Sequence, residues 1–322
     1  MKATVQDTYG PPRQVLGLRD IDKPEIGGGD DVLVRVRAAG VNPADLAITR
    51  GRPAMIRAMV GMRRPKPAVR GQDLAGVVEA VGANVTLFSP GDEVFGEGTS
   101  SYAEYTCVPQ GVLAPKPAGL TFEQAAAVPM AGLTALFGMR VANVGPGKRV
   151  LVNGASGGVG HFAVQIATAL GAEVTGVCSA RNVEMVRSLG ADHVIDYTRE
   201  DFTQGAQRYD VILDNVANRS LRALRRVLAP RGVLLLNSVN GGRVLGPLPR
   251  MARGRLLSVF SRQTIRVFSI ASTTKDLVAL TDLIDGGELT PVIEGVYPLA
   301  EAAAALDRVA TGHVAGKVVI TV

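Results

Sequence analysis

Tryptophan is absent from this 322-residue chain, and cysteine and histidine are scarce, with two and three residues respectively. Two cysteines far apart in the sequence provide no disulfide framework and favour a reducing compartment, so we expect a cytoplasmic protein. No uninterrupted apolar run approaches the roughly 18 residues of a membrane-spanning helix. The first ten residues also lack the apolar core of a signal peptide.

Acidic residues are missing from two long stretches, one between Asp45 and Asp73 and one between Asp214 and Asp276. Lysine or arginine recurs within both, and the formal net charge of the whole chain is +6. Such blocks raise the local positive potential and favour anionic partners. We do not expect a nucleic acid among them, because no DNA- or RNA-binding motif accompanies the charge and aromatic residues make up only 4% of the chain.

The hydrophobic pattern changes along the chain. The first third contains apolar segments typical of strands, separated by Gly, Pro and Asp turns, at residues 32–37, 74–81 and 102–108. From about residue 121 short apolar strands alternate with helical stretches, a pattern that indicates βαβ units and a parallel sheet. We predict an α/β protein with two domains: a β-rich domain from residues 1–120 and 256–322, and an inserted Rossmann dinucleotide-binding domain from residues 121–255.

A glycine-rich turn lies between a predicted strand at 149–152 and a predicted helix at 159–170. A strand that stops at such a turn, followed by a helix with free backbone N–H groups, binds a pyrophosphate at the positive end of the helix dipole. Gly157 lets the backbone approach the phosphates, and Gly160 lets the helix pack closely on the sheet. Ala155 stands where the usual G-x-G-x-x-G pattern has its first glycine, and Gly154 precedes it.

The end of the next predicted strand, 173–177, distinguishes NAD from NADP. An NAD enzyme carries an Asp or Glu here to bind the ribose hydroxyls, but the sequence from Val177 to Asn182 has no acid. Ser179 and Arg181 can bind a 2′-phosphate instead, Arg181 through its planar charged fork. The alternative is that Arg181 only caps or solvates a helix start. The first interpretation predicts NADPH as the cofactor.

Several motifs in a fixed order now indicate a family. They are residues 39–45 (AGVNPAD), 71–76 (GQDLAG), 102–105 (YAEY), 153–160, 189–197 (LGADHVIDY) and 316–319 (GKVV). Over nearly its whole length the chain resembles the zinc-independent, quinone-oxidoreductase branch of the medium-chain dehydrogenase/reductase superfamily. The resemblance implies a GroES-like β-rich substrate domain wrapped around a Rossmann domain, an active site between them, and a homodimer.

The same resemblance predicts that no zinc is bound. Zinc alcohol dehydrogenases hold their catalytic metal with a Cys, a His and a second Cys, and the matching positions here are Asn42, Gln72 and Pro129. The three histidines do not lie with cysteines at metal-ligand spacing.

The resemblance also assigns site residues. It implies that Asn42 faces the nicotinamide or the substrate, that Thr134 lies beside the nicotinamide ring and that Tyr197 lies near the adenosine phosphate. Asn215 and Ser238, at the ends of later strands, face the crevice where open α/β sheets bind ligands. The remaining residues assigned to the cofactor are Ser156, Gly158, Val159 and Lys317. A lysine common at the 2′-phosphate in related reductases is replaced by Asn182, which weakens the NADPH prediction without reversing it.

Without a Lewis acid, an enzyme loses its main device for stabilising charge on the oxygen of a plain ketone or alcohol. Quinones and α,β-unsaturated carbonyl compounds need less help, since they accept hydride at carbon and spread the charge. We therefore predict a quinone or activated-alkene reductase with a small hydrophobic substrate. Asp45 has either a catalytic or a turn-shaping role, and Tyr102 either donates a proton, stacks on a flat substrate or only packs in the interior.

Two basic and apolar segments, 50–70 and 245–268, leave further alternatives open. Met55, Met59 and Met62 are spaced for one face of a short helix among arginines. These segments are either plain packing, a lid, or a soft rim for a long-tailed quinone at a membrane surface or an acyl chain on a phosphorylated carrier. The alternative functions are an enoyl-thioester reductase and a low-turnover NADPH-binding sensor or stress protein.

Overall fold

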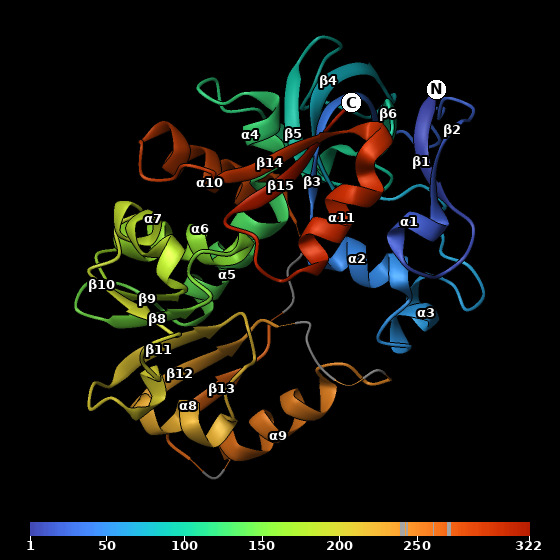
Figure 1. Ribbon diagram of the computed structural model, residues 1–322. Coiled ribbons are helices and arrows are strands. Elements are labelled where there is room, and N and C mark those ends of the chain that lie inside the picture. The colour runs from blue at the N-terminus through green and yellow to red at the C-terminus, as the bar shows by residue number, and fades with distance from the viewer. Residues whose placement is uncertain (239–241, 243, 260, 269–271) are drawn as a thin grey trace. The chain divides into compact units, whose positions relative to one another are not determined.

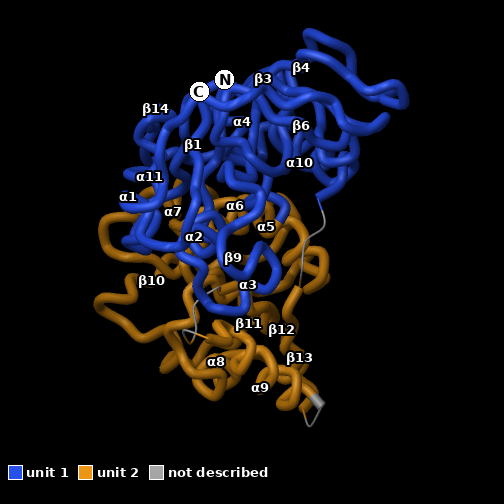
Figure 2. The backbone as a smooth tube through the Cα atoms, turned by 90° about the vertical axis from the view of Figure 1, so that its right-hand side faces the viewer, with its two compact units in different colours: residues 1–133, 271–322 blue, residues 134–270 orange. Residues whose placement is uncertain are grey.

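The computed structural model describes residues 1–238, 242, 244–259, 261–268 and 272–322. The chain divides into two compact units, coloured separately in Figure 2. Unit 1 contains Met1–Leu133 and Ala271–Val322, and unit 2 contains Thr134–Ile270. Unit 2 is therefore inserted into unit 1 in the sequence.

Unit 2 is built on a six-stranded sheet whose neighbouring strands are all parallel. Its strands are β8 (Arg149–Asn153), β9 (Glu173–Cys178), β10 (His193–Asp196), β11 (Tyr209–Asp214), β12 (Leu228–Leu236) and β13 (Thr264–Arg266). The order β10-β9-β8-β11-β12-β13 is the doubly wound order of dinucleotide-binding folds. This order confirms the predicted Rossmann domain.

Helices cover both faces of this sheet. Figure 1 shows α6 (Gly158–Ala169) and α7 (Val183–Ser188) on one side and α8 (Leu221–Val227) and α9 (Leu248–Val259) on the other. A sheet buried on both faces needs continuous apolar strands rather than alternating ones. The strands of unit 2 supply such apolar side chains. Leu151, Ile212 and Leu234 lie on three of these strands and share one buried core with Leu224 of α8.

Unit 1 contains a seven-stranded sheet centred on the long strand β3 (Asp31–Val41). Antiparallel partners of β3 are β4 (Asp73–Val81), β6 (Tyr105–Pro109) and β15 (Lys317–Thr321). The other strands of this sheet are β5 (Glu93–Glu97), β7 (Leu113–Pro115) and β14 (Ile293–Pro298), while β1 (Lys2–Gln6) and β2 (Leu16–Asp20) form a separate ribbon.

The helices of unit 1 are short. They are α1 (Pro12–Val15), α2 (Pro43–Arg50), α3 (Met55–Val60), α4 (Phe122–Ala126), α10 (Thr274–Asp285) and α11 (Ala302–Ala310), and α5 (Pro129–Val141) spans the boundary between the units. Among the described residues, no helix has the length and apolar character needed to cross a membrane.

The unit boundaries differ from the predicted 120/121 and 255/256. The α4 helix packs against β3 and β4 and so remains with unit 1, and the boundary falls inside α5. The expectation that the chain leaves the parallel sheet after about residue 255 is wrong, because β13 pairs with β12 as a sixth strand. This strand has three residues, of which only Ile265 is buried, so it has no recognisable period.

Candidate functional site

The phosphate-binding turn of unit 2 begins where β8 ends. Gly154 has a φ of +84°, a backbone conformation that favours glycine, and its N–H and that of Ala155 both donate to the carbonyl of Val177 in β9. A Cβ on Gly160 would lie 2.0 Å from the carbonyl oxygen of Gly154, whereas one on Gly157 would lie 3.4 Å from it. Gly160 is therefore required for packing, and Gly157 is required only if a ligand approaches closely.

The α6 helix begins at Gly158, directly after this turn, and no side chain caps it. The first N–H groups of a helix have no intrahelical acceptor, so they remain available to an anion. Asn182 adds a constraint that the sequence did not reveal, because its Nδ2 donates to Ser156 Oγ at 2.9 Å. This hydrogen bond joins the phosphate turn to the turn that follows β9.

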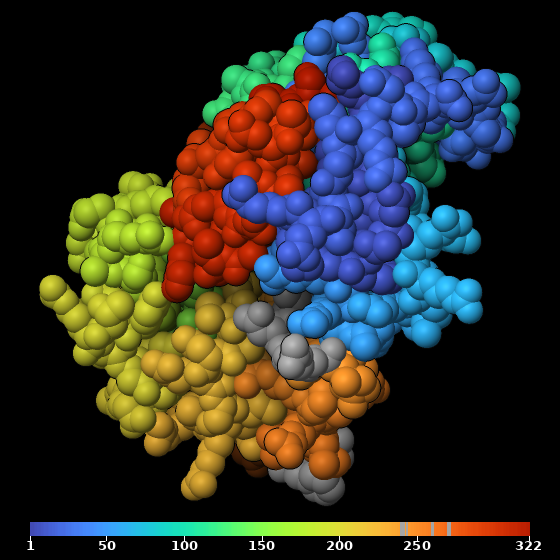
Figure 3. Space-filling view, turned by 45° about the vertical axis from the view of Figure 1, so that its right-hand side comes forward, coloured from blue at the N-terminus to red at the C-terminus, as the bar shows by residue number. Residues whose placement is uncertain are grey.

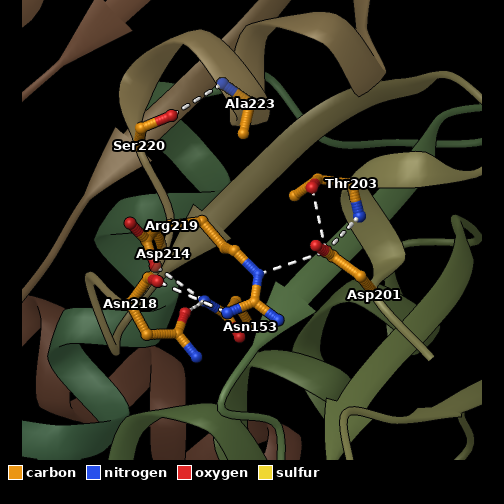
Figure 4. A network of polar contacts seen from close by, with 8 residues as sticks. All are labelled: Asn153, Asp201, Thr203, Asp214, Asn218, Arg219, Ser220 and Ala223. Carbon is orange, nitrogen blue, oxygen red and sulfur yellow. Dashed lines mark hydrogen bonds and ion pairs between the residues drawn. The ribbon is translucent and has the colours of Figure 1, made fainter. Parts of the chain in front are cut away.

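A buried carboxylate holds the neighbouring strand ends in place. Asp214, the last residue of β11, accepts hydrogen bonds at Oδ1 from Asn153 Nδ2 at 2.8 Å and from the backbone N–H of Ala217 at 3.0 Å. Figure 4 shows that Asn153 donates to both Asp214 and Asn218, which lie at the two sides of the same turn. Asn153 immediately precedes the glycines, so Asp214 fixes the start of the phosphate turn.

Asn215 carries an unfilled hydrogen-bond position at this edge. Its Oδ1 accepts from Asn237 Nδ2 at 2.7 Å, and its backbone N–H donates to the carbonyl of Asn153. Its own Nδ2 is buried and has no hydrogen-bond partner among the described residues. A buried amide donor without an acceptor is costly, so this atom fits a ligand that brings an oxygen to the carboxyl end of the sheet.

The residues predicted to bind the adenosine part follow β9 and β10. Ser179 and Arg181 lie in the turn after β9, and the N–H of Tyr197 donates to the carbonyl of Cys178. The structure also places Asp196, the last residue of β10, opposite Cys178 at the end of β9. An acid that is distant in the sequence therefore lies beside this turn. Hydrogen bonds from Thr198 are the main cause of a lowered pKa for Asp196, so this carboxylate is charged and already bound.

In unit 1 a second polar group of residues lies at one end of the seven-stranded sheet. Four adjacent strands, β15, β3, β4 and β5, each contribute one residue at or just beyond that end. In sheet order these residues are Lys317, Asn42, Asp73 and Glu97. Because neighbouring strands are antiparallel, the beginnings of two strands and the ends of the other two meet at this edge.

Hydrogen bonds connect three of these four side chains. Asn42 Nδ2 donates to Asp73 Oδ2 at 2.9 Å, and Lys317 Nζ donates to both Asn42 Oδ1 at 2.5 Å and Asp73 Oδ2 at 3.2 Å. Asp73 Oδ1 also accepts the backbone N–H of Met130 at 3.0 Å. Since the side chains of Lys317 and Asp73 are 3% and 0% exposed, they form a buried ion pair that fixes the orientation of the Asn42 amide.

Asp45 and Tyr102 extend this network. Asp45 Oδ2 accepts the backbone N–H of Asn42 at 2.9 Å, which closes a capping box at the start of α2, and accepts the hydroxyl of Tyr102 at 3.1 Å. Burial, with a smaller effect of Asp73, raises the pKa of Asp45 to about 7. Tyr102 is fully buried in a core with Val41 and Leu306, so the structure contradicts the interpretation that Tyr102 stacks on a flat substrate.

Sequence reasoning missed two charged residues of this network. Asp73 lies inside a motif that was recognised only as a family marker, and Glu97 ends β5 opposite Asp73 in the register. Burial and then the charge of Asp73 raise the pKa of Glu97 to about 7. No local pattern marks either residue, because their partners lie far away in the sequence.

The structure thus brings the predicted residues into two groups. Asn42, Asp45, Tyr102 and Lys317 are joined in unit 1, so Lys317 belongs to the Asn42 network, and its assignment to the cofactor stays a prediction. The other assigned residues, Thr134, Ser156, Gly157, Gly158, Val159, Ser179, Arg181, Tyr197, Asn215 and Ser238, all belong to unit 2.

The three positions matched to zinc ligands can also be located. Asn42 is bound by Asp73, the residue after Gln72, and Asp73 also binds the N–H of Met130, the residue after Pro129. Gln72 Oε1 is buried and accepts no hydrogen bond from the part of the chain that the structure describes. Within the described ranges, no group of three or more His, Cys, Asp or Glu side chains is arranged to hold a metal ion.

Comparison with known proteins places the chain in a family. Residues 28–118 match the family described as "Alcohol dehydrogenase GroES-like domain", and residues 189–320 match "Zinc-binding dehydrogenase". The mitochondrial NAD(P)H oxidoreductase RTN4IP1 of Mus musculus is 35% identical over 356 residues, which cover 100% of this chain and 89% of that protein. The chloroplastic NADPH-dependent alkenal/one oxidoreductase of Arabidopsis thaliana is 33% identical, with 99% and 79% coverage.

The solved structures agree with this assignment. The quinone oxidoreductase from Coxiella burnetii matches with a TM-score of 0.88 and 31% sequence identity, over 100% of this chain and 99% of that one. The similarity therefore includes both units and the insertion of one within the other. The chain belongs to the medium-chain dehydrogenase/reductase family, in its quinone-oxidoreductase-like branch.

Proposed function

We propose that the protein is a zinc-free, NADPH-dependent reductase that acts on quinones or on the conjugated C=C bond of enals and enones. Unit 1 is then the substrate domain and unit 2 the cofactor domain. The names of the relatives, a quinone oxidoreductase and an alkenal/one oxidoreductase, support this substrate class. The observation that carries the proposal is the contact of Lys317 with Asn42 and Asp73.

The residues of unit 2 fit NADPH, which supplies hydride when bound. Ser156, Gly158 and Val159 lie at the positive end of α6, where they would bind the pyrophosphate. Ser179 and Arg181 would bind the 2′-phosphate, and the unpartnered Nδ2 of Asn215 would donate to an oxygen of the cofactor. The turn needs no rearrangement of its backbone to accept a phosphate, since Gly157 has no Cβ to obstruct it.

The network of unit 1 supports chemistry without zinc. Asn42, Gln72 and Pro129 offer neither a thiolate nor an imidazole, the ligands that zinc prefers. Two of the oxygens here, Asn42 Oδ1 and Asp73 Oδ2, already accept hydrogen bonds from the Lys317 ammonium, and the unpartnered Gln72 Oε1 is an amide oxygen, not a thiolate or an imidazole. The ligand positions of this chain thus depart from those expected of a zinc-binding dehydrogenase, the family that residues 189–320 match.

The same network suggests roles for the three catalytic candidates. Asn42, with its amide held by Lys317 and Asp73, would orient the nicotinamide or the substrate oxygen. Asp45 and Tyr102 would act through the backbone of Asn42 and the start of α2, which makes them positioning residues. An acceptor that spreads charge over a quinol or an enolate suits such a site, because an amide stabilises oxygen charge less than a metal does.

The test is a screen of NADPH oxidation with quinones, enals, enones, enoyl thioesters and plain ketones, together with elemental analysis of chelated protein. We expect turnover of quinones, enals or enones, none of plain ketones, and no dependence on zinc. Activity that rises with bound zinc would contradict the proposal. Preference for enoyl thioesters would assign the alternative reductase, and tight NADPH binding without turnover would assign a sensor.

Exposed methionines on α3 and after it support a peripheral membrane contact. The side chains of Met59 and Met62 are 79% and 71% exposed, so both present apolar surface that a membrane contact would cover. Arg63 and Arg64 follow directly and would attract anionic lipids. The protein should then cosediment with anionic vesicles and be released by salt, and the double charge reversal Arg63→Glu/Arg64→Glu should weaken binding while turnover of a water-soluble quinone persists.

We also propose a cytoplasmic homodimer. Both cysteines, Cys107 and Cys178, are free, which suits a reducing compartment, and the dimer follows the habit of the family. Light scattering of the purified protein and fractionation of the cells that make it test these two statements separately.

A further inference from the structure

A groove separates α8 from α9 on unit 2. Its cavity volume is about 470 Å³, within the range of small-molecule sites. Both helices contribute to it, and its lining residues are Ser220, Leu221, Pro249, Arg250, Arg253, Leu256 and Leu257. Figure 1 shows the two helices next to each other, and in Figure 3 the gold surface of the α8 region meets the orange surface of α9. None of these residues belongs to the phosphate turn.

Most of the groove wall is apolar. Leu221 lies at the start of α8, and Leu256 and Leu257 lie on the last turns of α9, with Pro249 at the other end of that helix. Leu256 is 61% exposed although it lines a concave surface. An apolar ligand chain would remove this leucine from water, which is the favourable direction of the hydrophobic effect.

Arg250 supplies a partly satisfied cation to the groove. Its Nη2 donates to Asp214 Oδ2 at 2.8 Å, and its Nη1 donates to the carbonyl of Arg219 at 2.8 Å. Figure 4 shows the turn that carries Asp214 and Arg219. Arg250 Nε is buried, and no residue that the structure describes is its hydrogen-bond partner. One donor of a tightly held guanidinium is therefore left for an acceptor that is not part of the described chain.

The charge around the groove is positive throughout. Arg253 lies one turn after Arg250 on α9 and is exposed to solvent. No acid lines the groove, and the chain has none between Asp214 and Asp276. Asp214 itself already accepts from Arg250, Asn153 and Ala217. An anionic group would thus find two arginines, of which Arg250 is already paired with Asp214 and Arg253 is the one that lines the groove exposed to solvent.

We propose that this groove binds one molecule of an amphiphilic anion, an alkyl or acyl chain that ends in a carboxylate or a phosphate. The chain lies along Leu221, Leu256 and Leu257, and the anionic group lies at Arg253 and the free Nε of Arg250. The apolar wall excludes a simple inorganic anion as the best ligand, and the two arginines disfavour a neutral lipid. None of the residues that line this groove is one that we assign to NADPH.

The experiment uses the full chain and three probes: decyl phosphate below its micellar concentration, decyl maltoside, and butyl phosphate. Isothermal titration should give one site for decyl phosphate, at least about tenfold tighter than for either other probe, since a charge-assisted hydrogen bond contributes about 1.5–3 kcal/mol. Many weak sites or equal binding of decyl maltoside would overturn the proposal.

Two matched variants locate the site. Arg253→Glu and Arg255→Glu make the same charge change on the same helix at two exposed positions, but only Arg253 lines the groove. Arg253→Glu should weaken the binding of decyl phosphate at least about tenfold, and Arg255→Glu should leave this affinity nearly unchanged. Equal losses would show attraction to the general surface charge and overturn the proposal.

A third variant and a vesicle control complete the test. Leu256→Asn should weaken the binding of decyl phosphate and leave the binding of butyl phosphate unchanged, because this substitution alters only the apolar wall. All three variants replace exposed side chains, so circular dichroism and NADPH binding should match the wild type. If anionic vesicles bind with the same dependence on Arg253 while decyl phosphate in solution does not bind, the partner is a bilayer surface and the single-molecule site is wrong.

Discussion

The polar groups of the two units are arranged in opposite ways. At the carboxyl edge of unit 2, the donors are mainly backbone N–H groups, and the Nδ2 of Asn215 has no partner. In unit 1, the Lys317 ammonium, the Asp73 carboxylate and the Asn42 amide bind one another and are almost completely buried. The first arrangement is open to a ligand and the second is closed on itself.

This difference teaches how each group contributes to function. Open donors at a helix start are prepared for an anion and cost little to maintain, because water satisfies them until the ligand arrives. A closed network of charges does not need a ligand, and its effect is to hold the one amide that the resemblance places at the reaction. We therefore expect damage to unit 1 to appear first in stability and damage to unit 2 to appear first in cofactor binding.

The largest effect should come from breaking the closed network. Lys317→Met removes the ammonium and leaves the Asp73 carboxylate buried with no cation in contact. Breaking one partner of a buried ion pair costs about 3–5 kcal/mol. We expect a loss of this size in the free energy of unfolding, measured by urea denaturation.

A double variant separates the charge from the packing. Lys317→Met combined with Asp73→Asn removes both charges, so it should be less destabilised than Lys317→Met alone. If Lys317→Met loses less than about 1 kcal/mol, then the pair is not what holds this part of unit 1 together.

The same contrast explains what the sequence could predict. The turn between β8 and α6 is local, since strand, glycines and helix follow one another within a dozen residues, and its pattern was sufficient. Lys317 lies 275 residues from Asn42 and 244 from Asp73, and no spacing rule connects them. It was therefore assigned to the cofactor on the strength of its motif alone. Apolar segments bounded by turns likewise predicted β3 and β4, but three-residue β13 escaped detection.

In unit 2, the preference for NADPH should depend on Arg181. A charge-assisted hydrogen bond to the 2′-phosphate contributes about 1.5–3 kcal/mol, equivalent to about 10- to 150-fold in affinity. Arg181→Ala should raise the dissociation constant of NADPH by such a factor and leave that of NADH nearly unchanged. Arg187→Ala, on the next helix in an exposed pair with Glu184, is the control. Equal effects of Arg181→Ala on both cofactors would contradict its assignment to the phosphate.

Two glycines of the phosphate turn should separate stability from binding within unit 2. A Cβ at position 160 meets the Gly154 carbonyl at 2.0 Å, so Gly160→Ala forces the turn apart and should cost about 1–3 kcal/mol of stability. A Cβ at position 157 is 3.4 Å from the same oxygen. Gly157→Ala should therefore fold as the wild type does and lose NADPH affinity, because the new methyl group faces the pyrophosphate. Calorimetric unfolding and NADPH titration of both variants measure the two effects. An unchanged affinity of Gly157→Ala for NADPH would mean that this turn does not bind the pyrophosphate.

The last effect is a dependence of stability on pH that originates in unit 1. Burial raises the pKa of Asp45 from 3.8 to about 7, so the folded protein binds this proton more tightly than the unfolded chain does. Stability should consequently fall as the pH rises from about 4 to 7 and then level off, at a slope of up to about 1.4 kcal/mol per pH unit for this group. Asp73 opposes ionisation, while Lys317, Tyr102 and the N–H of Asn42 favour it. Asp45→Asn should reduce the slope between pH 5 and pH 7 in urea titrations and leave the part that Glu97 contributes, because the pKa of Glu97 is also raised to about 7. The exposed Asp22→Asn should preserve the whole slope. A slope that Asp45→Asn does not reduce would mean that Asp45 is already ionised over this range, and the closed network would then contain an additional negative charge balanced by Lys317 and the buried Arg70.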